Sequence, residues 1–241
     1  MKRVTKALAD TTSKMLFRTC EVTAVAAHGA YFRSIELAGD ALKNATWNVG
    51  DKIKVRIDPD GFTTRTYTPV SWDTTRGSTR LLVYMHGSGP GAAWVRAVTT
   101  GAPCQFSGPR GSLQLDDLDR PILFVGDETS FALVAAWRGY HPDAPPAAEL
   151  FEVSEPDESC VALEAMGLSS ARLFSRDRPA HLEQLSVTVI DLLRTHAAAS
   201  LCLTGRAQTI GALRREIKDA GLAGRPIRVK AYWDENRSGT D

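Results

Sequence analysis

The sequence predicts two domains of different fold class: a six-stranded antiparallel β-barrel over residues 1–116, then an α/β domain with a parallel sheet over residues 117–241. Up to about residue 115 apolar and polar residues alternate, which is typical of half-buried strands. After residue 120, continuous apolar runs are each followed by a helical pattern, which indicates a doubly wound parallel sheet. The acidic turn at residues 116–120 separates the two patterns, so we expect the domain boundary there.

Six strand-like segments make up the predicted barrel. They lie near residues 15–26, 31–37, 52–57, 62–68, 79–85 and 103–107. Gly, Asp, Pro and Asn separate these segments, as turns require. One segment differs, because residues 91–98 read as a single short helix.

Strands and helices alternate in the second half of the chain. The predicted strands lie near residues 122–125, 147–153, 171–174, 200–204 and 227–232, and the predicted helices near 129–140, 156–166, 187–197 and 208–220. In the last helix Ile210, Leu213 and Ile217 fall on one face, and Gly221 is placed to cap its carboxyl end.

Composition limits the possible functions. The 241 residues are 43% hydrophobic and 24% charged, as in globular proteins, and the net charge of +1 argues against a nucleic-acid or membrane-surface partner. The four cysteines are far apart, which favours free thiols over a metal site. The amino terminus lacks the apolar segment of a signal peptide, and there is no run of eighteen apolar residues. We therefore expect a cytoplasmic protein without bound metal, and a monomer because no exposed apolar stripe is evident.

The segment Arg65-Thr66-Tyr67-Thr68-Pro69 combines a cation, an aromatic ring and hydroxyl groups on one predicted strand. Strand geometry places Arg65 and Tyr67 on one side and Thr66 and Thr68 on the other. Arg65 could bind a pyrophosphate with two hydrogen bonds, Tyr67 could cover an isoalloxazine ring, and Thr68 could reach a flavin ring nitrogen. The alternative is an amphipathic strand with a solvated arginine and a half-buried tyrosine.

A glycine-rich segment leads into the short helix at residues 86–94, and it contains Gly87, Gly89 and Gly91. Bare backbone N–H groups at a helix amino terminus form an anion site, which could share the pyrophosphate with Arg65. The alternative is a loop that uses glycine and proline only to turn. His86 by itself is typical of a structural hydrogen-bonding residue.

The loop Gly126-Asp127-Glu128-Thr129 follows the first strand of the α/β domain, where open α/β sheets bind their ligands. It lacks the G-x-G-x-x-G pattern and carries two carboxylates, which argues against tight dinucleotide binding. The alternative is a helix start, because Asp127 or Thr129 can act as an N-cap.

Five motifs occur in a specific order: R-T-Y-T-P at 65–69, H-G-S-G-P-G-A-A-W at 86–94, G-P-R-G at 108–111, G-D-E-T at 126–129 and A-Y-W at 231–233. Together they resemble the siderophore-interacting protein family of ferric-siderophore reductases, a branch of the ferredoxin reductase superfamily. The resemblance spans about residues 15–233. It implies an FAD-binding barrel, an α/β domain for the reductant, and a ferric siderophore that approaches the flavin between them.

The resemblance also implies roles for individual residues. The flavin carries the redox chemistry, so no side chain has to act as acid or base. The implied cofactor-binding residues are Arg65, Thr66, Tyr67, Thr68, His86, Gly87, Gly91, Ala92 and Trp94. The residues implied to lie near the nicotinamide are Thr68, Asp127, Glu128 and Thr129, and those expected to bind the siderophore are Lys230 and, from its period-two relation to Lys230, Arg228.

Four positions depart from the family pattern. Ala92 replaces the usual serine near the phosphates, Arg206 replaces the usual glutamate, and Ser130-Phe131 stand where small or aliphatic residues are more usual. These changes leave FAD binding intact and put the use of a nicotinamide in question. The pyridine nucleotide itself is open, because Glu152 and Glu155 would suit a ribose diol whereas Arg176 and Arg178 would suit a 2′-phosphate.

Three functions follow from these observations. The first is a cytoplasmic FAD-dependent reductase that takes electrons from NADH or NADPH and releases ferrous iron from ferric siderophores. The second is a flavoprotein that exchanges electrons with a protein such as ferredoxin. The third is a flavin-loaded module that binds ferric siderophores or senses iron with little turnover.

Overall fold

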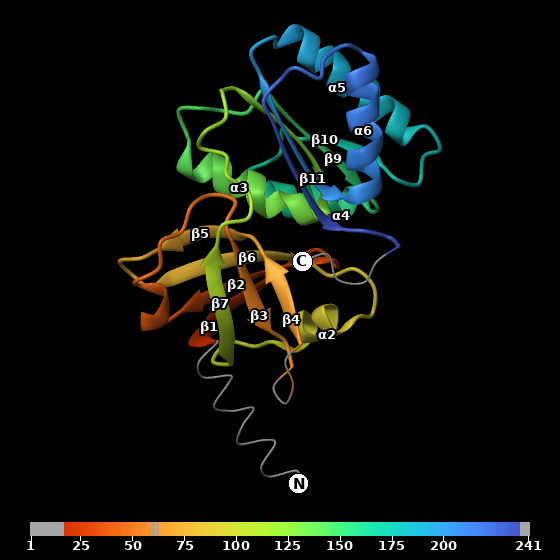
Figure 1. Cartoon of the computed structure of the whole chain (residues 1–241). Coiled ribbons are helices and arrows are strands. Elements are labelled where there is room, and N and C mark those ends of the chain that lie inside the picture. The colour runs from red at the N-terminus through yellow and green to blue at the C-terminus, as the bar shows by residue number, and fades with distance from the viewer. Residues whose placement is uncertain (1–16, 59–60, 62, 237–241) are drawn as a thin grey trace.

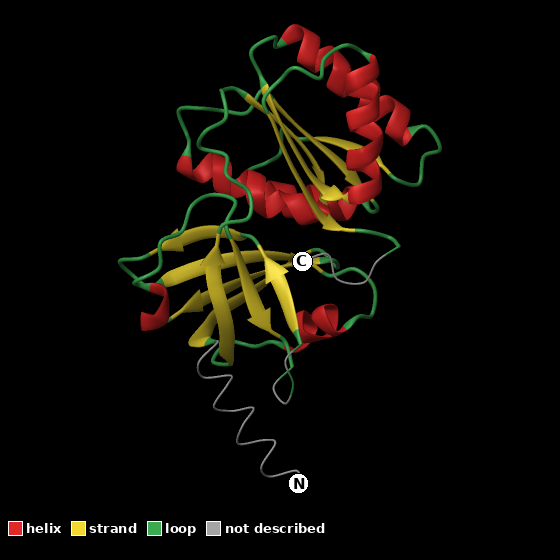
Figure 2. Ribbon diagram, in the orientation of Figure 1, coloured by secondary structure: helices red, strands yellow, loops and turns green. Residues whose placement is uncertain are grey.

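A computed structural model describes residues 17–58, 61 and 63–236 of the chain. A curled antiparallel sheet forms one half of the molecule, and a parallel sheet flanked by helices forms the other (Figures 1 and 2). This is the predicted order of fold classes. The predicted first and fourth strands start at residues 15 and 62; residues 15, 16 and 62 lie outside the described residues.

The first sheet has seven strands within the described residues, so the prediction of six was wrong. They are β1 (Arg18–His28), β2 (Phe32–Ala38), β3 (Lys52–Arg56), β4 (Thr64–Tyr67), β5 (Pro69–Asp73), β6 (Ser78–Tyr84) and β7 (Pro103–Arg110). Their order is β4-β3-β7-β1-β2-β6-β5, and all neighbours are antiparallel. The missed strand is β5, because only Thr68 separates it from β4 and the two read as one segment.

The two edges of this sheet are joined by that single residue. β4 and β5 are consecutive in the chain, yet they lie at opposite ends of the strand order. The sheet therefore has to curl until its edges meet at Thr68, which produces the barrel shape even though β4 and β5 form no ladder with each other. Pro69, which has no N–H group to donate, stands at the start of an edge strand, where it is tolerated.

Alternation along β3 separates core from surface. Ile53 and Val55 are completely buried in the barrel, whereas Lys52, Lys54 and Arg56 are only partly buried and face outward. The predicted short helix is α2 (Pro90–Ala97), which packs Ala92 and Val95 against the same core.

The second sheet has the strand order β10-β9-β8-β11-β12, and all its neighbours are parallel. Its strands are β8 (Ile122–Asp127), β9 (Ala148–Val153), β10 (Arg172–Ser175), β11 (Ser200–Arg206) and β12 (Ile227–Trp233). Its helices are α3 (Phe131–Tyr140), α4 (Pro156–Ala165), α5 (His181–Thr195) and α6 (Ala207–Asp219). The helix α5 starts six residues before the predicted helix at 187.

Helix α3 joins the two halves of the molecule. It lies between the parallel sheet and the barrel (Figure 2), and every residue from Phe131 to Trp137 is buried. One hydrophobic cluster accordingly contains side chains of both halves, with Phe32, Val70 and Leu82 from the barrel. The other face of the parallel sheet packs on α5 and α6 in a separate cluster. The predicted boundary at residue 116 lies between β7 and β8, and its position stays a prediction.

An aromatic ring on α3 contacts aromatic rings in both halves of the molecule. The Phe131 ring lies 4.7 Å from that of Phe151 on β9 and stacks at 5.5 Å on that of Phe32 on β2. At the far end of the helix, the Tyr140 hydroxyl donates to the carbonyl of Trp72 at 2.8 Å and accepts from its N–H at 3.0 Å. The two halves are therefore joined by apolar contacts at one end of α3. At its other end they are joined by hydrogen bonds from a side chain to the backbone.

None of the helices in the described part of the chain combines the length and hydrophobicity needed to cross a membrane.

Replacing Phe131 with alanine tests the shared core. Because this ring is fully buried between β2 and β9, we expect Phe131→Ala to lower the free energy of unfolding by about 3 to 5 kcal/mol. Urea denaturation followed by circular dichroism measures the change. Val187→Ala, at a side chain that is 53% exposed on α5, is the control and should change stability by less than about 0.5 kcal/mol. Equal effects of the two substitutions would contradict a shared core at Phe131.

Candidate functional site

Arg65 and the amino end of α2 lie together. On β4, Arg65 and Tyr67 are paired with the buried Val55 and Ile53, so both side chains project from the barrel-interior side of the sheet. A Cβ atom added at Gly91 would lie only 3.1 Å from the Cγ atom of Arg65. Glycine at position 91 therefore lets the arginine approach the backbone of the first turn of α2.

The glycine loop before α2 leaves room for a ligand. Added Cβ atoms at Gly87 and Gly89 would meet nothing within 4 Å, and the φ angle of Gly87 is +65°. Gly89 is the N-cap and Pro90 the first residue of α2, so the next N–H groups have no partner within the helix. With the exposed guanidinium of Arg65, they form a set of hydrogen-bond donors suited to an anion, and cofactor binding by Gly87, Gly91 and Ala92 stays a prediction.

Tyr67 contacts the same helix. Its ring stacks on that of Trp94 with centroids 6.2 Å apart and planes inclined by 28°. Burial raises the pKa of Tyr67, so its phenol is neutral at physiological pH. The structure thus brings together Arg65, Tyr67, Gly91 and Trp94, four residues that the sequence motifs singled out.

His86 and Thr68 meet the end of β12. The His86 ring lies between those of Tyr84, at 5.6 Å, and Trp233, at 6.5 Å. The Thr68 side chain lies next to the buried hydroxyl of Tyr232, and burial raises the pKa of that phenol. The carboxyl end of the parallel sheet therefore contacts the two barrel segments that carry the motifs. Thr66 is partly buried on the outer face of β4, opposite Lys54.

Asp127 is fully buried at the end of β8. Its Oδ1 atom accepts from the N–H of Thr129 at 2.8 Å and from the Thr129 hydroxyl at 2.5 Å, and its Oδ2 atom accepts from the indole of Trp233 at 2.6 Å. Burial raises the pKa of this carboxyl to about 6, although the hydrogen bonds from Thr129 and Trp233 oppose the shift. Asp127 thus accepts the hydrogen bonds that a helix N-cap accepts, and Thr129 donates them. A role of either residue near a nicotinamide stays a prediction.

Glu128 is also buried, and it links the two halves. Its carboxylate accepts from Arg176 at 2.5 and 2.7 Å and from the N–H of Ser154 at 2.7 Å. Tyr84 on β6 lies next to this group; burial, and then the Glu128 charge, raise the pKa of Tyr84 to about 12. Glu128 therefore satisfies groups from the barrel and from the loops after β9 and β10.

A second buried carboxylate explains the unusual Arg206. Glu152, which is 1% exposed at the end of β9, accepts from the Thr209 hydroxyl at 2.6 Å and lies 3.3 Å from Nε2 of His181. Arg206 approaches Glu152 at 3.9 Å and binds Glu235 at 2.7 Å. An arginine at this position supplies positive charge to a carboxylate that burial would otherwise leave poorly compensated.

The unusual Ser130-Phe131 pair has structural roles as well. The Ser130 hydroxyl accepts from the Thr204 hydroxyl at 2.8 Å and packs so closely on Gly126 that no Cβ would fit there. Phe131 belongs to the shared core described above.

The two residues expected to bind a siderophore have different surroundings. The guanidinium of Arg228 forms an ion pair with Asp117 and donates to the carbonyl of Gln114 at 3.0 Å, which fixes the edge strand β12 to the segment between the sheets. Lys230 is partly buried and lies in register with Thr204 on β11. Binding of a siderophore by either side chain stays a prediction.

Residues 52–113 match the family model of the siderophore-interacting FAD-binding domain. The predicted resemblance is therefore confirmed. The matched segment contains β3, β4 and the glycine loop, which are the elements that bring Arg65, Tyr67 and Gly91 together. The sequence matches no curated protein.

Solved structures show the same fold. A siderophore utilization protein from T. fusca is 22% identical, with a TM-score of 0.70 over 93% of this chain and 95% of that one. Full-length CYP116B46 from Tepidiphilus thermophilus is 19% identical, with a TM-score of 0.72 over 92% of this chain, which spans only 30% of that protein. Phthalate dioxygenase reductase is 15% identical, with a TM-score of 0.70 over 90% of this chain and 68% of that one. The fold is that of ferredoxin reductase-like proteins.

The residues present fit an FAD molecule. The open space at Gly87 and Gly89, the N–H groups at the start of α2 and the Arg65 guanidinium suit a pyrophosphate. Tyr67 provides an aromatic surface beside this anion site. These groups lie on adjacent elements, as a dinucleotide with one charged and one aromatic portion requires.

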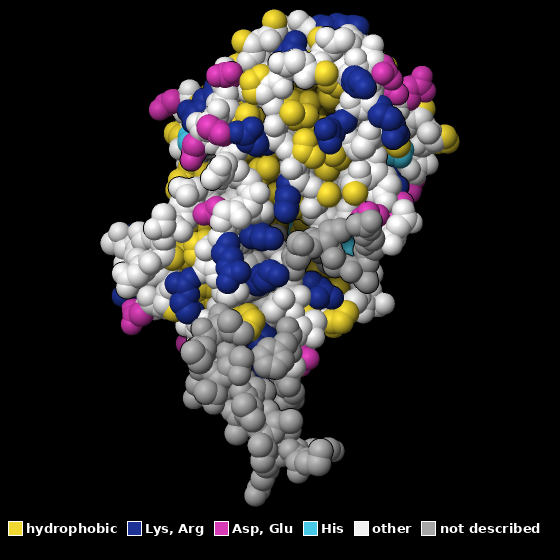
Figure 3. Space-filling model, viewed as in Figure 1, with side chains coloured by type: hydrophobic (Ala, Val, Ile, Leu, Met, Phe, Trp, Pro, Cys, Tyr) yellow, Lys and Arg dark blue, Asp and Glu magenta, His cyan; other side chains and the backbone are white. Residues whose placement is uncertain are grey.

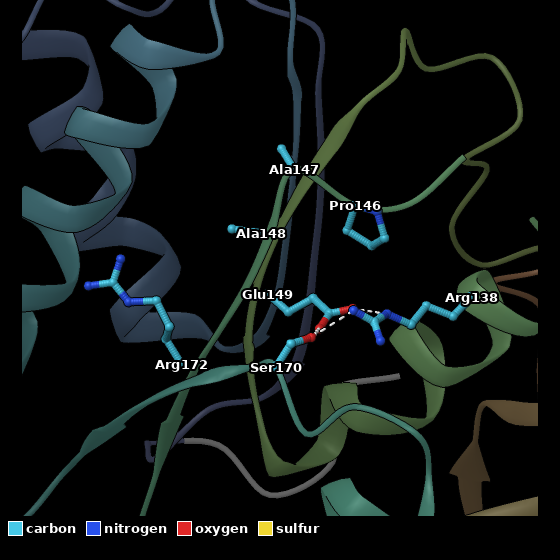
Figure 4. Close-up of a pocket in the computed structure, with 7 residues that line it drawn as sticks. All are labelled: Arg138, Pro146, Ala147, Ala148, Glu149, Ser170 and Arg172. Atoms are coloured by element: carbon cyan, nitrogen blue, oxygen red, sulfur yellow. Dashed lines mark hydrogen bonds and ion pairs between the residues drawn. The ribbon is translucent and has the colours of Figure 1, made fainter. Parts of the chain in front are cut away.

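A pocket at the opposite edge of the parallel sheet contains none of the predicted site residues (Figure 4). It has a volume of about 200 Å³ and lies where β9 begins. On one side of it, Nε of Arg138 binds the buried carboxylate of Glu149 at 2.6 Å and Nη2 donates to Ser170 at 2.8 Å. Arg172 points away from this group (Figure 4). These contacts join α3 to the parallel sheet and have no relation to the motifs.

The raised pKa of Asp127 predicts a pH dependence of stability. Because the folded pKa of about 6 exceeds the ordinary value of 3.8, the native state binds this proton more tightly than the unfolded state does. The resulting stabilisation is complete below about pH 4 and is lost as the pH rises through 6, and two pH units correspond to about 3 kcal/mol.

Urea denaturation of the wild type and Asp127→Asn between pH 4 and 7 measures this effect. The free energy of unfolding of the wild type should fall relative to that of the variant as the pH rises. A constant difference between the two proteins would show that Asp127 does not titrate in this range.

Proposed function

We propose that this protein is an FAD-dependent ferric-siderophore reductase of the cytoplasm that acts as a monomer. The observation that carries the proposal is the meeting of Arg65, Tyr67 and the first turn of α2 within the segment that matches a siderophore-interacting FAD-binding domain. NADH, NADPH or ferredoxin would supply the electrons.

In this proposal the flavin, when bound, supplies the redox chemistry, since it accepts electrons in pairs and releases them singly. Arg65 and the N–H groups of α2 hold the pyrophosphate, and Tyr67 fixes the orientation of the ring system. Thr68 lies at the meeting point of the barrel and β12, where it can donate to the cofactor. The protein's contribution is therefore positioning, with no side chain needed as an acid or a base.

The substrate's chemistry accounts for iron release. Siderophores bind Fe(III) with hard oxygen ligands, which hold the ferrous ion far less tightly. Transfer of one electron therefore loosens the complex. The same preference makes the ferric complex hard to reduce, so ferrous trapping or protonation of the siderophore has to draw the reaction forward.

A second candidate function is electron exchange with a protein partner. It is favoured by the contacts of Glu152 and Arg176, two residues that a pyridine nucleotide would use, because both bind other protein groups. A flavin-loaded siderophore-binding or iron-sensing module is the third candidate, and turnover distinguishes it from the other two.

Reduction of a ferric siderophore by the flavin-loaded protein tests the proposal. The protein is purified, saturated with FAD, reduced anaerobically with dithionite in stoichiometric amount and mixed with a ferric siderophore in the presence of a ferrous chelator. Reoxidation of the flavin and formation of the coloured ferrous complex support a reductase. A protein that binds neither FAD nor FMN would refute the proposal, whereas binding without iron reduction would favour the sensing module.

Substitution of Arg65 tests the cofactor site. Arg65→Ala removes the charged donor for the pyrophosphate, which is worth about 1.5 to 3 kcal/mol, so the dissociation constant of FAD should rise by about 10- to 150-fold. Flavin fluorescence titration measures the constant. Arg172→Ala removes an exposed arginine from the parallel sheet and should leave it unchanged. An unaltered affinity in Arg65→Ala would make Arg65 a solvated surface residue.

Substitution of Lys230 tests the substrate site. If this ammonium group attracts anionic ferric complexes, Lys230→Ala should raise the KM for a ferric catecholate by roughly three- to tenfold and weaken its salt dependence. The KM for a neutral ferric hydroxamate should stay the same. Lys218→Ala, at an exposed position on α6, is the matched control. Equal changes for the two substrates would remove Lys230 from the site.

A further inference from the structure

A cavity of about 160 Å³ lies at the amino-terminal edge of the parallel sheet, where β11 and β12 begin. The last turns of α5 and α6 form its sides, with Leu193 on α5 and Lys218 on α6. From this edge the two strands run to their far ends at Arg206 and Trp233, where the sheet contacts the barrel. The cavity contains none of the residues that the motifs singled out.

The floor of this cavity is apolar. Its side chains are Leu193, Leu201, Ile217, Leu222 and Ile227. The first three are at most 5% exposed, and the other two pack against the same hydrophobic cluster. A charged group placed on this floor would lose its hydrogen bonds to water, whereas a hydrocarbon chain would gain by leaving water. The floor is therefore suited to an apolar chain.

Two basic side chains stand at the rim of the cavity. Arg214 and Lys218 are exposed and lie four residues apart on one face of α6. Figure 3 shows hydrophobic side chains on this face of the α/β half, with Lys and Arg side chains around them. Within the part of the chain that the structure describes, neither Arg214 nor Lys218 forms an ion pair. Like charges at this spacing repel each other, so an anion between them would be stabilised and would relieve the repulsion.

A third cation makes the surroundings of the rim more positive. The guanidinium of Arg225 donates to the carbonyls of Leu193, His196 and Ala197 at 2.5, 3.1 and 2.7 Å. Carbonyls at the carboxyl end of a helix such as α5 carry partial negative charge, which would repel an anion. Arg225 compensates this charge, and the residues that line the cavity include three basic side chains and no acidic one.

We propose that this cavity binds a fatty-acid-type carboxylate, with the hydrocarbon chain on the apolar floor and the carboxylate between Arg214 and Lys218. At about 30 Å³ for a group the size of a water molecule, the cavity holds about five methylene groups. This size fits a chain of roughly six to eight carbons with its head group at the rim. The site is independent of the proposed function, because it lies at the other end of β11 and β12 from the candidate cofactor site.

Chemical-shift titration of the full chain in excess FAD tests the site. Octanoate, the probe, should shift the amide signals of residues 217–227 and leave the signal of Gly91 unchanged. Burial of one methylene group is worth about fourfold in affinity, so the dissociation constant should fall about fourfold for each carbon added to butanoate. It should reach roughly 1 mM or less for octanoate and then level off for longer chains, once the cavity is full.

Two variants separate the head group from the chain. Arg214→Ala/Lys218→Ala removes the rim cations and should weaken octanoate binding by about three- to tenfold, without changing the binding of octanol, which is neutral. Ala223→Trp places a large ring at an exposed position of the cavity wall and should weaken the binding of both probes by about tenfold or more. Arg215→Ala, exposed on the same helix but outside the cavity, is the matched control and should change neither affinity.

The absence of any saturable shift near the cavity would overturn the inference, and Arg214 and Lys218 would then only cover apolar surface with their side-chain stems. An octanoate affinity that the double substitution leaves unchanged would also overturn it, since the rim would not bind the carboxylate. Binding to phosphatidylglycerol vesicles without binding of octanoate would assign the patch to a membrane surface instead. The dissociation constant of FAD is measured separately, so a failure here leaves the proposed function intact.

Discussion

The arrangement of the two halves depends on the buried carboxylate of Glu128. A buried ionised carboxylate is tolerated only where donors surround it, and here the donors come from separate parts of the chain: Arg176 after β10 and the N–H of Ser154 after β9. Tyr84 on β6 of the barrel lies beside the same charge. The barrel, the parallel sheet and the loop after β8 are consequently held in one arrangement, and α3 fills the space beside this charged contact with apolar side chains.

This constraint also determines what the loop after β8 can do. In a nucleotide-binding sheet the loop after the first strand offers backbone groups to a ligand, whereas here it offers side chains to the protein. Asp127 holds Trp233 and Thr129, and Ser130 holds Thr204. The groups suited to bind an anion lie instead on the barrel, where Arg65 and the first turn of α2 meet.

The sequence allowed the fold class to be predicted because the period of the apolar residues changes from two to a strand–helix alternation near residue 116. It did not reveal β5, because a one-residue connection carries no turn signal. In the candidate site, the association of Arg65 with the glycine loop was predictable from motifs of known chemistry. The contact of Trp233 with Asp127 was not, since 106 residues separate them and the two motifs that contain them do not show which side chains meet. The alternative of helix capping for Asp127 was visible from its spacing to Thr129.

The position of Thr68 has a consequence for how the barrel can vary. Since this one residue connects the two edge strands, which form no ladder with each other, cutting or lengthening the chain here would let the two edges separate and open the curled sheet. An added residue would also reverse which side chains of β4 face the interior relative to those of β5. The segment that carries Arg65 and Tyr67 cannot change length without moving the edges of the barrel, because the same few residues join these edges and contribute to the candidate cofactor site.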